Sequence, residues 1–114
     1  MSSLRTEAYP YEQLITTLHQ CMTACNRCYD ACLEEDDLTM MRYCIRVDRE
    51  CSDMCSLFEQ ALTRNTPFIK ELANACMEIC YACAEECKKH DHDHCQACAD
   101  ACMKCVEECK KVLN

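Results

Sequence analysis

The chain of 114 residues contains no glycine, no tryptophan and only two prolines, Pro10 and Pro67. Tight β-hairpin turns depend on glycine and proline, so a β-rich fold is poorly supplied with turns. The phosphate-binding loops of nucleotide enzymes also need glycine, and the sequence shows neither a nucleotide motif nor a serine, histidine and aspartate set for nucleophilic catalysis. We therefore do not expect an enzyme.

Long apolar runs and an excess of positive charge are missing as well. No run approaches the roughly 18 apolar residues of a membrane-spanning helix. Residues 1–20 lack the basic region and apolar segment of a secretory signal. The formal net charge of −8 argues against nucleic acid or an anionic membrane as a partner. These absences predict a cytoplasmic protein that binds neither membranes nor nucleic acids.

Large aliphatic side chains are scarce, since Leu, Ile, Val and Phe together number 18. A content this low is typical of disordered chains. The sixteen cysteines change this interpretation, because a protonated cysteine packs as a small hydrophobic residue. The same residues can therefore build the core and carry the chemistry. The length suits a single domain, which we place at residues 11–114 after a flexible leader at 1–10.

The cysteines recur almost entirely at intervals of three and four residues, which places side chains along one face of an α-helix. Cysteines four apart on one helix make poor disulfide partners, so we expect reduced thiols. The four stripes consist of Cys21, Cys25, Cys28 and Cys32; Cys44, Cys51 and Cys55; Cys76, Cys80, Cys83 and Cys87; and Cys95, Cys98, Cys102, Cys105 and Cys109.

Four helices are expected from these stripes. An aspartate of the acidic cluster at 34–37 can cap the second helix. For the third helix, Asn65, Thr66 and Pro67 are interpreted as turn, N-cap and first helical position. The expected helices run from about residue 11 to 33, from the 34–37 cluster through residues 41–62, from 67 through 87, and from 90 through 112.

The order of residues within each stripe predicts the topology. In the first and third helices the apolar residues precede the cysteines, and in the second helix they follow them. Short connections make consecutive helices antiparallel neighbours. The prediction is an all-α, antiparallel up-down-up-down four-helix bundle with a cysteine-lined core. One end should hold a metal-binding mouth at the 34–37 and 88–94 loops, and the other an apolar plug of Leu14, Leu18, Phe58, Leu62 and Ile69.

A core of thiolates favours a soft metal, and Cu(I) fits best. One Cu(I) per displaced thiol proton leaves the core formally neutral, whereas a zinc ion on four thiolates leaves two buried negative charges. Pairs at helical spacing also suit a metal that bridges two sulfur atoms. Two alternatives are a zinc-buffering protein like metallothionein, although no Cys-X-Cys motif is present, and an iron–sulfur electron carrier, although such clusters use cysteines gathered from loops.

The mouth carries further soft donors, because imidazole and thioether can both bind Cu(I). The positive end of the fourth helix should favour thiolate at Cys95 and Cys98. Asp48 interrupts the second stripe, either as a polar spacer or as an outward-turned side chain. The candidate mouth ligands are His90, His92, His94, Met40 and Met41.

The segments CMEICYACAEEC at 76–87 and HCQACADAC at 94–102 make the chain similar to the bacterial copper storage proteins, in their cytosolic branch. The resemblance covers roughly residues 11–113 and implies that each of the sixteen cysteines is a Cu(I) ligand. It also implies a homotetramer of four-helix bundles, each holding many Cu(I) ions for storage or detoxification. Copper ions are then the main partners, with a copper chaperone as a candidate for loading.

Overall fold

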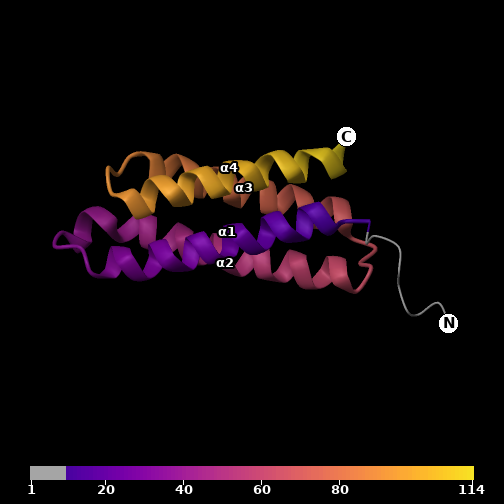
Figure 1. The fold of residues 1–114 in the computed structure, drawn as a ribbon, viewed down its shortest axis with the longest axis horizontal. Helices are drawn as coiled ribbons and strands as arrows, with labels where there is room; N and C mark the ends of the chain where they lie inside the picture. The colour runs from indigo at the N-terminus through magenta and orange to yellow at the C-terminus, as the bar shows by residue number, and fades with distance from the viewer. Residues whose placement is uncertain (1–9) are drawn as a thin grey trace.

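The computed structural model of the chain describes residues 10–114, so the expected leader at 1–10 lies outside the described residues except for Pro10. The helices run alternately up and down along one long axis (Figure 1). This arrangement confirms the predicted all-α, antiparallel bundle. The helices are α1 (Glu12–Leu33), α2 (Leu38–Thr63), α3 (Ile69–Lys88) and α4 (Asp93–Leu113).

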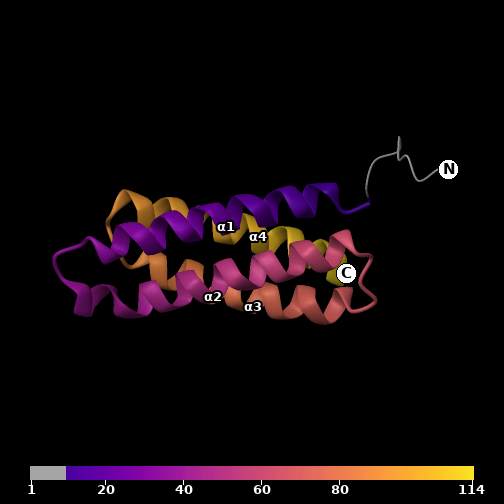
Figure 2. The ribbon, with the colours of Figure 1, turned by 90° about the horizontal axis from the view of Figure 1, so that it is seen from below.

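Each helix of the bundle packs against two neighbours. Both α1 and α3 pack against α2 and α4, which places α1 opposite α3 and α2 opposite α4 across the core (Figure 2). The α1–α2 and α3–α4 connections lie together at one end, which we call the mouth end. The α2–α3 connection and the C-terminus lie at the other, the closed end. The two loops predicted to share an end therefore do so.

The helix boundaries follow local capping chemistry. The Asp37 side chain accepts a hydrogen bond of 3.1 Å from the Met40 backbone N–H, which confirms the expected aspartate cap of α2. The predicted start of α3 at Pro67 is wrong, because the helix begins at Ile69.

The cause lies in the end of α2. Asn65 takes a left-handed φ of 62°, and the Thr66 N–H bonds back to the Ala61 carbonyl at 3.0 Å. Thr66 is thereby used to close α2, and its hydroxyl accepts the Phe68 N–H at 3.1 Å in the turn that follows.

The start of α4 also differs from the prediction. The helix begins at Asp93 with His92 as its N-cap residue, so of the three predicted histidines only His94 lies within it. The Gln96 side-chain amide donates a hydrogen bond of 2.7 Å to the His90 carbonyl. This bond holds the α3–α4 connection against the first turn of α4.

The core changes composition along its length. At the closed end Leu14, Leu18, Phe58 and Leu62 are almost completely buried, as predicted for the apolar plug. Ile69 is half-buried and packs on the edge of this cluster. Toward the mouth end, the interior consists largely of cysteine. Apolar packing and thiol packing therefore share one continuous core.

The outer faces of the helices are polar. They carry exposed ion pairs at helical spacing, such as Lys111 with Glu108 at 2.7 Å and Arg49 with Asp53 at 3.2 Å. Exposed pairs of this kind contribute little to stability. Within the described part of the chain, no helix combines the length and the apolar character needed to cross a membrane.

Candidate metal centre

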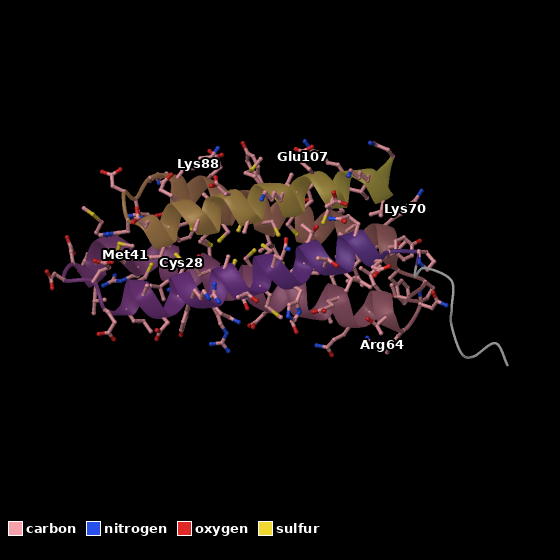
Figure 3. All side chains as sticks on the ribbon, viewed as in Figure 1. Cys28, Met41, Arg64, Lys70, Lys88 and Glu107 are labelled. Carbon is pink, nitrogen blue, oxygen red and sulfur yellow. The ribbon has the colours of Figure 1, made fainter. Side chains whose placement is uncertain are left out.

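All sixteen cysteines point into the bundle. Every one is completely buried, and every sulfur is a free thiol. The sulfur atoms gather along the axis between the helices, from the mouth end near Met41 and Cys28 toward the middle of the bundle (Figure 3). Each of the four predicted stripes thus faces the same interior.

Sulfur atoms from different helices approach one another closely. Cys51 Sγ on α2 lies 3.5 Å from Cys80 Sγ on α3, and 3.8 Å from Cys102 Sγ on α4. The second contact crosses the diagonal of the bundle, between helices that do not pack directly. Nearer the mouth, Cys44 Sγ lies 3.6 Å from Cys87 Sγ. The stripes therefore merge into a single column of sulfur.

The column divides into overlapping groups of donor atoms, with all atoms of a group within 4.8 Å of one another. Several cysteines belong to two groups, so one sulfur can serve two neighbouring metal positions. The groups include Cys21, Cys55, Cys80 and Cys105; Cys21, Cys25, Cys51 and Cys102; Cys25, Cys83, Cys98 and Cys102; Cys28, Cys32, His94 and Cys95; and Cys28, Asp48, Cys87 and Cys98.

Burial sets the protonation state of the thiols nearest the mouth. Loss of solvation raises the pKa of Cys95 to about 12, and it raises the pKa of Cys32 as well. This direction is opposite to the expected thiolate at Cys95, whereas hydrogen bonds from Cys102 and Cys25 lower the pKa of Cys98, in the expected direction. In the copper-free protein Cys32 and Cys95 are protonated and pack as small apolar groups.

Asp48 is completely buried among the thiols, which excludes the outward-turned side chain and agrees with a polar spacer. Its Oδ1 atom accepts hydrogen bonds from the thiols of Cys83 at 3.3 Å, Cys98 at 3.4 Å and Cys87 at 3.5 Å. Burial, together with the nearby sulfur groups, raises the pKa of Asp48 to about 10. The carboxyl group is therefore protonated at neutral pH.

His94 is the predicted mouth residue that reaches the sulfur column. Its Nδ1 atom lies 3.5 Å from both Cys28 Sγ and Cys95 Sγ, and 3.9 Å from Cys32 Sγ. Met41 is also buried, at 1% exposed, and lies in the same core cluster. The first turns of α2 and α4 thus bring a thioether and an imidazole to the mouth end of the column.

The other three mouth candidates lie outside the sulfur column. The His90 imidazole is buried against Glu86, with 2.9 Å between His90 Nε2 and Glu86 Oε2. His92 is 43% exposed at the side chain. Met40 is 65% exposed, beside a hollow of about 230 Å³ that Asp37, Met41 and His92 also line.

Glu35 belongs to the site although its sequence position does not reveal it. In the sequence it is one member of an acidic cluster that ends a helix. In the fold its Oε2 atom lies 2.9 Å from His94 Nε2 and 3.5 Å from His92 Nδ1. The one available signal was topological, since the loops at 34–37 and 88–94 were expected at the same end.

Comparisons with known proteins agree with this geometry. A profile described as copper storage protein matches residues 7–114. The uncharacterized cysteine-rich protein YhjQ of Bacillus subtilis (strain 168) is 50% identical over 85 residues, which cover 75% of this chain and 79% of that protein.

Solved structures share both sequence and fold with the chain. The Cu(I)-bound copper storage protein BsCsp3, from Bacillus subtilis, is 48% identical with a TM-score of 0.88, covering 91% of this chain and 98% of that chain. A cytosolic copper storage protein from Streptomyces lividans, with five coppers, is 36% identical with a TM-score of 0.85, covering 88% of each chain. A family profile that spans nearly the whole sequence, together with these matches, shows that the chain belongs to the copper storage protein family.

Proposed function

We propose that this protein stores Cu(I) in the cytoplasm, with many ions held by thiolates along the bundle core. The observation that carries the proposal is the sharing of cysteines between neighbouring donor groups. Cys21, for example, belongs to one group with Cys25 and to another with Cys55. Such sharing suits bridging sulfur atoms and a continuous chain of ions rather than separate sites.

The charge of the core favours Cu(I) over zinc. Each Cu⁺ ion that binds a thiol displaces one proton, so a thiolate–Cu(I) unit is formally neutral. A divalent ion on four thiolates would leave two negative charges in an interior that is already closed to water. Uptake releases protons, and copper affinity should therefore weaken as the pH falls.

The relatives support the same function. One solved relative is Cu(I)-bound, and another is described as cytosolic and contains five coppers. Membership in a copper storage family favours a storage role over catalysis, and we propose that the protein is not an enzyme.

We propose all sixteen cysteines as Cu(I) ligands. Copper enters at the mouth end, where His94 Nδ1 and three thiols form the first donor group of the column. Met41 adds a buried thioether beside that group. The exposed Met40 and His92 side chains are proposed as transient contacts for incoming copper, and the ligand role of His90 stays a prediction.

A homotetramer and a copper chaperone are the proposed macromolecular partners. An apolar groove of about 280 Å³ runs between α3 and α4 and supports self-association. It is lined by Met77, Glu78, Tyr81, Met103, Val106 and Lys110. Aromatic and methionine side chains are typical of protein interfaces.

Anaerobic titration of the reduced protein with Cu(I), against a competing chromophoric chelator, tests the storage function. Copper and free thiols are counted in the same samples, and protein with alkylated thiols is the control. We expect saturation near one copper per thiol with tight retention. Saturation at only a few ions, a preference for zinc in a parallel titration, or iron–sulfur absorbance after anaerobic purification would contradict the proposal.

A further inference from the structure

Glu35 connects the two loops of the mouth end. It lies in the α1–α2 connection, and its Oε2 atom faces two histidines of the other loop region. His94 Nε2 lies 2.9 Å from this oxygen, and His92 Nδ1 lies 3.5 Å from it. One carboxylate oxygen is therefore shared by two imidazole rings.

The contact with Glu35 determines which nitrogen of His94 carries the proton. The Glu35 carboxylate offers only acceptor oxygens to His94 Nε2, which lies 2.9 Å from Oε2. In neutral His94, Nε2 must then carry the hydrogen and Nδ1 must present its lone pair. That lone pair lies 3.5 Å from the sulfur atoms of both Cys28 and Cys95.

A second contact restrains the ring. The His92 and His94 imidazoles are stacked, with centroids 5.2 Å apart and planes within 4° of parallel. Because Glu35 also contacts His92, the carboxylate and the stacked ring act on His94 from its edge and its face. His94 is only 22% exposed at the side chain, so it has little freedom to turn away from the thiols.

We propose that Glu35 is a positioning residue for copper uptake, which holds His94 as its Nε2–H tautomer so that Nδ1 can bind the first Cu(I) at the sulfur column. This inference rests on the proposed storage function and deepens it. Outer carboxylate partners of metal-binding histidines have this role in other sites, and losing one lowers metal affinity or activity by about 10–100-fold. Glu35 would not touch copper itself.

The neighbouring acidic residues do not share this role. Asp37 is committed to capping α2 through the Met40 N–H. Glu34 is exposed, and its contacts are backbone hydrogen bonds at the end of α1. Glu34→Ala is therefore a matched control, which removes the same charge from the same loop without touching a histidine.

The first test uses the copper-free, reduced protein with ¹⁵N-labelled histidine. At a pH where imidazole is neutral, the ring ¹⁵N shifts distinguish the two tautomers. We expect the Nε2–H form of His94 in the wild type and in Glu34→Ala, and a measurable Nδ1–H population in Glu35→Ala. Unchanged His94 shifts in Glu35→Ala would overturn the proposal. This readout involves no copper, so it is independent of whether the protein stores the metal.

The second test measures the rate at which the first copper equivalents transfer from a chelator. Glu35→Ala should slow this step by about 10–100-fold, while Glu34→Ala and the total copper capacity stay unchanged. In a His94→Ala background, Glu35→Ala should add no further slowing. An equal effect of Glu35→Ala with and without His94 would mean simple charge attraction and would overturn the positioning role. Failure of storage itself would instead appear as low capacity in the wild type.

Discussion

At the closed end the four helices meet on hydrocarbon, whereas at the mouth end they meet on sulfur, imidazole and carboxyl groups. Leu18 and Phe58 represent the first kind of contact and are completely buried. Asp48 and Cys44 represent the second and are buried to the same degree. Equal burial therefore has different consequences, because desolvation stabilises an apolar side chain in every state, whereas it disfavours the charged form of a group that can ionise.

This difference suggests that the two ends have separate roles, one in metal binding and one in stability. A thiol column closed to water keeps its own protons until a soft metal replaces them. The hydrocarbon plug holds the helices together whether or not the column contains metal. We therefore expect the bundle to bind copper with little change of shape.

The largest expected effect is on the plug. Phe58→Ala should lower the free energy of unfolding of the copper-free protein by about 3–5 kcal/mol, because it removes a large, fully buried side chain. Urea unfolding of the reduced protein, followed by circular dichroism, measures this loss. Leu57→Ala, at a 49% exposed neighbouring position, is the control and should have little effect. If Phe58→Ala also slowed copper uptake strongly, the proposed distinction between the two ends would be contradicted.

The next effect concerns Asp48, whose pKa is raised from its ordinary value of 3.8 to about 10. The folded protein keeps this proton over a pH range in which the unfolded chain has lost it. Stability from this group is therefore fully present below pH 3.8 and is lost progressively as the pH rises to about 10.

Asp48→Asn cannot ionise and should become the more stable protein as the pH rises, by about 1.4 kcal/mol per pH unit relative to the wild type within that window. Urea unfolding at several pH values checks this slope. The control is Asp53→Asn, on the exposed face of the same helix. Its free energy of unfolding should change with pH in the same way as that of the wild type. If the free energies of unfolding of Asp48→Asn and the wild type differed by the same amount at every pH, the buried, protonated carboxyl group would be contradicted.

The smallest expected effect is on the rate of copper uptake when cysteines at different depths of the sulfur column are replaced. Replacing Cys95 and Cys98 with serine should slow copper uptake by about tenfold or more, which corresponds to ~1.4 kcal/mol. The matched replacement of Cys105 and Cys109, toward the closed end, removes the same number of ligands and should slow uptake much less. Stopped-flow transfer from a coloured chelator measures both rates. Equal rates would contradict loading from the mouth end.

Much of the fold could be predicted from periodicity. A stripe such as Cys76, Cys80, Cys83 and Cys87 can share one environment only on a helix, and all four of its members are buried. The reversal of apolar and cysteine halves in α2 then required an antiparallel arrangement. The start of α3 could not be predicted equally well, because it depends on how Asn65 and Thr66 close the preceding helix.

The site was predictable as a set of cysteines but not as a set of contacts. Glu35 and His94 are 59 residues apart, and nothing in either local sequence indicates their hydrogen bond. Asp48 looked like an interruption of the stripe, and only the packing of α2, α3 and α4 reveals the four thiols that donate to its carboxyl group. Similarly, adjacent Met40 and Met41 are equivalent in the sequence but differ in the fold, one exposed and one buried.

By itself, the sequence determined the helices, their inward faces and the soft character of the core, because spacing and side-chain chemistry are local properties. The tertiary structure decided which sulfur atoms share a group, which histidine reaches them and which carboxylate orients that histidine. These relations join residues on different helices, so they exist only once the four helices have packed together.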